Sequence, residues 1–177
     1  MACDITAGRL EPCKDSVGGI TAIYIGGAYT TDLLTSATIG ADGEVTAFAS
    51  ALTFYKYDLK GVNSFDQENT NDRNNGVSFW TQTGTVVLKK QDKATTAQLK
   101  LLSYGRPQII VEDYNGNFYL AGIENGVEVT VNTATGAGMA DLNGYNLNLT
   151  GTEKSPANFM AFTAMVSANN LVVVVGT

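Results

Sequence analysis

The chain has 177 residues, a formal net charge of −6 and no histidine. This length suits one domain, spanning residues 1–177, that buries roughly 70% of the surface exposed by its unfolded chain. Without histidine the chain lacks the usual general base at neutral pH, the commonest metal ligand and the Ser-His and Cys-His pairs of nucleophilic hydrolases. The composition therefore argues against the ordinary classes of enzyme.

Basic residues are few, with 11 Lys and Arg against 17 Asp and Glu. The densest basic group consists of Lys89, Lys90, Lys93 and Lys100, which we interpret as the solvated side of a strand end and a helix. Tight binding to a nucleic acid backbone needs clustered Lys and Arg. An acidic chain without such clusters should repel DNA at long range.

The first 16 residues are polar and lack periodicity, so residues 1–16 are expected to form an extended arm. Cys3 and Cys13 do not have the CxxC spacing of a zinc or redox site, and they are either bridged or free. The polar start does not resemble a signal peptide, and no run of 18 apolar residues could span a membrane. We expect a soluble protein, made in a cytoplasm, with no membrane partner.

Three segments in the first half of the chain favour β-strands. Residues 20–25 form a short apolar run between glycine pairs. Residues 44–57 have the length of one long curved strand, and residues 77–90 are its expected partner. In this partner Thr81, Thr83 and Thr85 share one face, and Gly84 is a candidate bend or bulge.

The segment 58–76, between these two strands, is rich in Asn, Asp and Gln. A loop of this length is uncommon in compact domains and is usually functional. We expect a long polar loop at the tip of a β-hairpin, held in place by another subunit.

Residues 92–104 are the only convincing helix. Asp92 can cap the first turn, and Gly105 with Pro107 ends the helix. The apolar positions that recur at helical spacing are Ala97, Leu101 and Tyr104, and Leu99 and Leu102 widen this stripe. The helix should pack on the sheet through these residues.

Residues 108–153 have the pattern of a β-meander. Asn115-Gly116 and Asn125-Gly126 supply the positive φ angles of two-residue hairpin turns, and Asn143-Gly144 precedes a clean apolar–polar alternation over residues 145–150. Residues 158–167 and 171–176 are two further strand candidates. The second contains four consecutive valines, which should be buried or covered by another chain.

No motif in the chain predicts a catalytic, cofactor or metal site. Residues 113–124 place oxygen ligands like a calcium loop, but the required sixth-position glycine is Phe118, so a hairpin turn is the preferred interpretation. We do not interpret the carboxylate pairs Asp42 with Glu44 and Glu112 with Asp113 as catalytic; Glu112 and Asp113 are neighbours in a strand, so their side chains point to opposite faces and cannot flank one bond. The glycines of residues 18–27 match no nucleotide-binding motif, and Trp80 suits either stacking or a core.

These elements predict a mainly β fold, a β-sandwich or barrel with one flanking α-helix and a long hairpin loop. This combination resembles the tail tube proteins of tailed bacteriophages, also called major tail proteins. The local sequence is similar to a family of phage virion proteins in three segments, which read CDITAGRLEPCKDSVGG, NGNFYLAGIENG and GAGMADLNGYNLNLTGTEKSPA.

The resemblance implies a structural virion subunit that assembles into hexameric rings stacked as a tube. Its partners would be copies of itself and other phage tail proteins, with DNA as transient, non-specific cargo in the lumen. The arm of residues 1–16 and the loop of residues 58–76 would make contacts between rings. The face lining the channel should be neutral to acidic and rich in Thr and Ser, since Lys or Arg there would trap DNA.

Other functions remain open on the sequence. A connector or ring protein, a baseplate component or a capsid decoration protein would share the same sandwich pattern. A carbohydrate-binding module would need several aromatic side chains aligned on a flat sheet. An unusual enzyme is the alternative least compatible with the absence of histidine.

Overall fold

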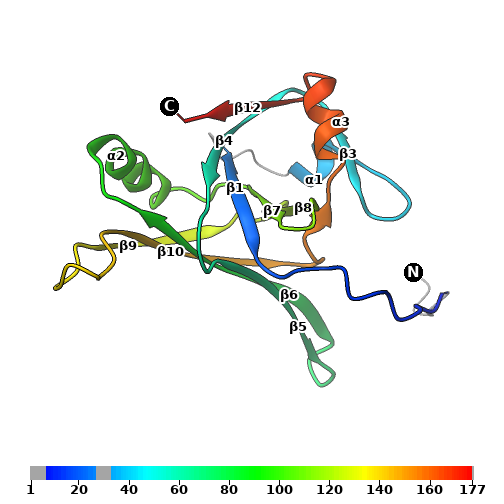
Figure 1. The fold of residues 1–177 in the computed structure, drawn as a ribbon. Helices are drawn as coiled ribbons and strands as arrows, with labels where there is room; N and C mark the ends of the chain where they lie inside the picture. Colours follow the sequence, from blue (N-terminus) through cyan, green and yellow to red (C-terminus); the bar gives the residue numbers. More distant parts are fainter. Residues whose placement is uncertain (1–6, 27–32, 177) are drawn as a thin grey trace.

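The computed structural model describes residues 7–26 and 33–176, and it shows a mainly β, sandwich-like fold. Three sheets are present among these residues, and Figure 1 shows the two larger sheets crossing. The six-stranded sheet has the order β11-β8-β7-β1-β4-β12, the four-stranded sheet has the order β5-β6-β10-β9, and β2 pairs with β3.

The strands of the six-stranded sheet come from distant parts of the chain. They are β1 (Ile20–Gly26), β4 (Leu52–Asp58), β7 (Ile109–Asp113), β8 (Phe118–Ala121), β11 (Asn158–Phe159) and β12 (Leu171–Val175). Neighbouring strands are antiparallel except for β12, which runs parallel to β4. The uninterrupted apolar runs of β1 and β7 fit this sheet, because both of its faces are buried.

The four-stranded sheet is antiparallel throughout and contains the longest strands. They are β5 (Ser64–Asp72), β6 (Val77–Lys89), β9 (Glu128–Ala134) and β10 (Gly144–Glu153). The side chains of β10 alternate as the sequence predicts, with Tyr145, Leu147 and Leu149 buried and the residues between them more exposed. One face of this sheet therefore packs on the six-stranded sheet, and the other face is polar.

Two apolar cores occupy the two faces of the six-stranded sheet. The core between the sheets includes Ile23 of β1, Val86 of β6 and Leu147 of β10, each 0% exposed. The core on the far side includes Phe54 of β4 and Ile110 of β7. It is covered by α1 (Leu33–Ser36), α3 (Phe162–Ser167) and the small sheet of β2 (Ala37–Ile39) and β3 (Val45–Phe48).

The helix α2 (Lys93–Leu102) forms as the sequence predicts, with a different buried face. Asp92 is its N-cap, and the Asp92 carboxylate accepts a hydrogen bond from the Thr95 amide at 2.8 Å. The Tyr145 hydroxyl contacts Thr96 at 2.6 Å and donates to the Asp92 carbonyl at 3.0 Å, which ties the helix start to β10. Leu99 is buried, whereas the predicted contact residues Ala97, Leu101 and Tyr104 are exposed.

The segment 58–76 is not a loop, because it contains the strand β5, paired with β6 along its whole length. Only residues 73–76 form the turn, which Figure 1 shows at the far tip of the hairpin. The expected partner of residues 77–90 was wrong for the same reason. Residues 44–57 divide into β3 and β4, which belong to different sheets, and β4 pairs with β1 and β12.

Three other expectations about secondary structure need correction. The described residues contain three helices, α1, α2 and α3, where one was expected. Residues 158–167 form the two-residue strand β11 followed by α3. The register of β6 with β10 and β5 continues through Gly84 without a bulge; a Cβ there would lie 3.1 Å from a methyl carbon of Leu149, so the glycine admits that side chain.

The meander of residues 108–153 is divided between the two large sheets. Asn115-Gly116 lies in a hairpin turn between β7 and β8, as expected, but the turn is longer than two residues, since the Asp113 amide bonds the Asn117 carbonyl, and only Gly116 of the pair has a positive φ. Asn125-Gly126 carries the chain from β8 to β9 in the other sheet. Gly126 has a φ of 74°, and a Cβ there would lie 2.4 Å from the Arg106 carbonyl oxygen. A side chain is therefore excluded at this crossing by both conformation and space.

Candidate assembly surface on the four-stranded sheet

The outer face of the four-stranded sheet has no covering layer among the described residues. The register aligns side chains across the four strands in rows that point away from the core. One row contains Glu128, Thr150, Thr83 and Asp66. The next contains Thr130, Asn148, Thr85 and Ser64, and all eight side chains are exposed.

This face is polar and weakly acidic. Thr81, Thr83 and Thr85 share it, as the sequence predicts, and β5 contributes the exposed carboxylates of Asp66 and Glu68. The two rows above contain no Lys or Arg, and Lys89 lies at the end of β6. The charge of Glu128 is partly balanced by Arg106, whose guanidinium lies 2.9 Å from the carboxylate oxygen.

The two outer strands of this sheet, β5 and β9, have free edges within the part of the chain that the structure describes. Free edges carry unpaired backbone donors and acceptors that can pair with another chain. Each strand is antiparallel to its neighbour across the four-stranded order, so β5 and β9 run in opposite directions. A β9 strand placed beside the β5 strand of a second copy in the same orientation would therefore extend an antiparallel sheet.

Two buried polar side chains hold the crossing that links this sheet to the six-stranded sheet. The Glu153 carboxylate accepts the Asn125 amide at 2.9 Å and the Glu124 amide at 3.3 Å. The Gln82 side-chain oxygen accepts the Gly122 amide at 3.0 Å. Burial raises the pKa of Glu153, and the two amide hydrogen bonds oppose this shift. These hydrogen bonds attach the segment between β8 and β9 to β6 and β10.

The structure gives the other sequence-derived candidates structural roles. The Asp113 carboxylate accepts the amides of Asn115 at 2.8 Å and Asn117 at 2.7 Å, so it closes the β7–β8 turn. Burial alone would raise the Asp113 pKa, but these hydrogen bonds lower it below its usual value. The Tyr24 hydroxyl donates to Glu112 at 2.6 Å. Among the described residues no group of three or more His, Cys, Asp or Glu could hold a metal.

Among the residues that the structure describes, the aromatic side chains do not form the flat platform that would favour a carbohydrate-binding module. Trp80 points to the inner side of its sheet, opposite Glu153 and Asn69 in the register, and is half-buried. The exposed Tyr104, Tyr114 and Phe159 lie near α2, in the β7–β8 turn and in β11. Cys13 is exposed, and Cys3 lies outside the described residues, so the question of a bridge stays open.

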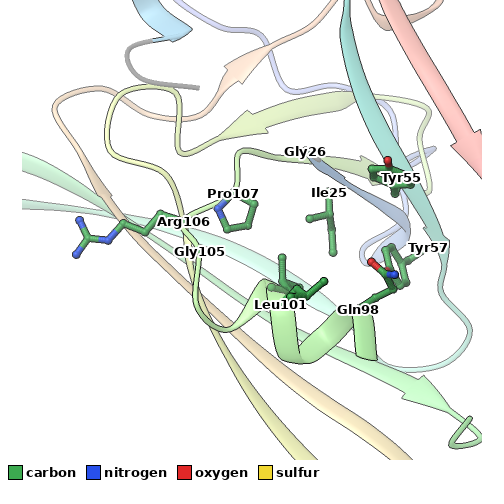
Figure 2. Close-up of a pocket in the computed structure, with 10 residues that line it drawn as sticks. Ile25, Gly26, Tyr55, Tyr57, Gln98, Leu101, Gly105, Arg106 and Pro107 are labelled. Atoms are coloured by element: carbon green, nitrogen blue, oxygen red, sulfur yellow. The ribbon is translucent and has the colours of Figure 1, made fainter. Parts of the chain in front are cut away.

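An apolar groove lies away from this surface, between β4 and α2. Figure 2 shows Tyr55 and Tyr57 of β4 opposite Leu101 and Gln98 of α2, with Pro107 beside them. The cavity has a volume of about 450 Å³. Its described lining is mostly apolar and aromatic, with Gln98 and Arg106 as the long polar side chains.

The free edge of β5 escaped the sequence reasoning because its composition is that of a loop. Its inward positions Gln67, Asn69 and Asn71 are polar, since this part of the hairpin extends beyond the apolar core. Phe65 is the one apolar residue of β5, so no apolar–polar alternation in the sequence marks this strand.

None of the described helices has the length and apolar character needed to cross a bilayer. Comparisons with protein-family models, curated proteins and solved structures found no match.

Proposed function

We propose that the chain is a structural virion subunit that assembles into closed rings, which are hexameric as in phage tail tubes and stack into a tube. The outer face of the four-stranded sheet lines its channel, through which DNA passes. The observation that carries the proposal is a polar, weakly acidic sheet face bounded by two free edges of opposite direction. The resemblance of the sequence to phage tail tube proteins points to the same role.

Edge pairing explains how a ring could close. A joint between β5 of one copy and β9 of the next uses different edges of the same subunit, so it is a head-to-tail contact that repeats until the ring closes. Closure satisfies the backbone groups of both edges and leaves a continuous barrel. The rows of Thr, Asn and carboxylate side chains would then face the lumen.

The electrostatics of this face suit a conduit. DNA contacts made through Lys and Arg release counterions and hold the duplex in place. The exposed carboxylates of Asp66 and Glu68 repel phosphates at short range, and this repulsion is screened beyond about 8–10 Å at physiological salt. A lumen of this kind lets DNA pass without binding it.

Proline substitutions in β9 test the joint. Successive residues of an edge strand direct their backbone amides alternately to the neighbour strand and to the free side. Of Thr130→Pro and Val131→Pro, one variant therefore loses a bond to β10, and the other loses only a donor on the free edge. The variant that loses only the free-edge donor should keep the free energy of unfolding of the wild type. It should nevertheless fail to form rings or tubes in electron micrographs.

The variant that loses a bond to β10 is the internal control. Its failure to assemble would follow from its weakened fold and not from a missing joint. Rings formed by the variant whose folding is unchanged, with the same subunit number as the wild type, would show that the β9 edge is not the joint.

A further inference from the structure

The strand β12 leaves the six-stranded sheet with a free edge of its own. It pairs with β4 on one side, and the described residues place no strand on the other side. The sequence predicts that its valines are buried or covered by another chain, and within one chain Val172 is 44% exposed, Val174 is 41% exposed and Val175 is 61% exposed. An apolar strand with a free edge is a template for pairing with another chain.

The exposed side of β12 adjoins the groove between β4 and α2. The parallel register sets Val172 beside Thr53 and Val174 beside Tyr55. Tyr55 is 45% exposed and forms one wall of the groove, opposite Leu101, which is 66% exposed. A strand added beside β12 would therefore find backbone partners at its edge and apolar side chains on this face.

The N-terminal arm has the complementary properties. Residues 7–17 are exposed throughout, and Leu10 is 92% exposed. Among the described residues, the hydrogen bonds of this segment include a local one from the Asp15 amide to the Cys13 carbonyl and a pair between Val17 and Asn115. Figure 1 shows the arm and the C-terminal end of β12 on opposite sides of the molecule. Eleven extended residues can reach about 35 Å.

We propose that the N-terminal arm of one copy adds to the free edge of β12 in another copy. This contact rests on the self-assembly proposed above and is separate from the β5–β9 joint. It satisfies exposed backbone groups on both segments, which is the basis of recognition by strand addition. A contact between the opposite sides of two copies links them end to end.

Proline fixes which residues of the arm pair with β12. Pro12 has no amide hydrogen to donate, so its backbone carbonyl should point away from β12. The backbone amide and carbonyl groups of the neighbouring residues Glu11 and Cys13 then point toward β12. The side chains of Leu10 and Pro12 share one face, and that of Cys13 lies on the other. With Leu10 on the side of Tyr55 and Val174, Cys13 lies on the side of Val173 and Val175.

Disulfide trapping with separately tagged chains tests the contact. The first chain carries Cys3→Ser and keeps Cys13 as its only cysteine. The second carries Cys3→Ser, Cys13→Ser and either Val173→Cys or Val175→Cys. After assembly of the mixture and mild oxidation, at least one of these two should give a heterodimer in non-reducing gels, because a disulfide needs Cβ atoms about 3.5–4.5 Å apart.

Val174→Cys is the matched control, since its side chain points to the opposite face. A heterodimer yield at least tenfold above this control supports the contact. Equal yields for all three cysteines, or none in a mixture that forms tubes, would overturn it while leaving the ring proposal intact. Failure of the wild type and every mixture to assemble would instead count against self-assembly, and with it against this contact.

Discussion

The hydrogen bonds that the Glu153 carboxylate accepts offer the sharpest test of how the two sheets are joined. Glu153→Ala removes the acceptor of the Asn125 and Glu124 amides. Glu124 is half-buried and Asn125 is exposed, so water can reach both amides after the substitution. Each lost hydrogen bond then costs about 0.5–1.5 kcal/mol, and the two together cost about 1–3 kcal/mol. For a chain of this size such a loss lowers Tm by about 2–12 °C.

Glu153→Gln is the matched variant, because it keeps the volume and one acceptor oxygen but does not titrate. Burial raises the pKa of Glu153 in the folded state, so the folded protein binds this proton more tightly than the unfolded chain. The contribution of Glu153 to stability is therefore greatest below the unfolded pKa and is lost as the pH rises through the folded pKa.

Urea unfolding of the wild type and both variants between pH 4 and pH 7 measures these effects. The stability of the wild type relative to Glu153→Gln should increase as the pH falls. If the free energy of unfolding of Glu153→Ala lies within about 0.5 kcal/mol of the wild-type value, the hydrogen bonds of Glu153 do not contribute to stability. A change of this size is typical of surface substitutions. A stability difference between wild type and Glu153→Gln that does not vary with pH would refute the raised pKa.

Three further predictions concern packing and charge. Gly144→Ala should destabilise the fold by more than about 2 kcal/mol in the same assay, because the new Cβ would lie 2.1 Å from the Leu88 carbonyl oxygen. A neutral effect would contradict the register of β10 with β6. Leu147→Ala should cost about 2–5 kcal/mol, since Leu147 is 0% exposed between the sheets, and a loss below about 1 kcal/mol would argue against a core there. The double variant Thr83→Lys, Thr150→Lys should make assembled particles retain DNA at low salt in a filter-binding assay. The control with two lysines on α3, Thr163→Lys with Ala164→Lys, should not retain DNA. Equal retention by both would contradict a lumen formed by the four-stranded sheet.

The sequence predicts the features of this fold that depend on local patterns. The helix cap at Asp92, the hairpin turn at Asn115-Gly116 and the alternation in β10 all follow from hydrogen bonding and side-chain periodicity within a few residues. The mainly β class follows from the same patterns. These elements fold as predicted because their neighbours in space do not oppose their local preference.

The errors occur where tertiary contacts decide. The parallel pairing of β12 with β4 joins residues more than 100 positions apart, and no local pattern encodes it. The buried face of α2 depends on the position of β10, which brings Tyr145 to its first turn. Polar β5 resembles a loop because its distal inner face has no core to pack against, although β6 supplies its backbone partners.

The candidate assembly surface was predictable in character but not in extent. The shared face of Thr81, Thr83 and Thr85 is visible in the sequence, and the expectation of a neutral to acidic channel face follows from the resemblance to phage tail tube proteins and from the need to pass DNA. The outer strands cannot be identified from the sequence, because β5 has the composition of a loop and the edges depend on the order of strands in the sheet. The sequence therefore indicates the chemistry of the surface, and the topology locates its edges.

A cryo-electron microscopy reconstruction of particles assembled from the purified chain tests the central claim most directly. We predict closed rings in which β5 of each subunit pairs with β9 of the next, with Thr83, Thr85 and Thr150 facing the lumen. A ring whose lumen is lined by another face, with both edges of the four-stranded sheet unpaired, would contradict it.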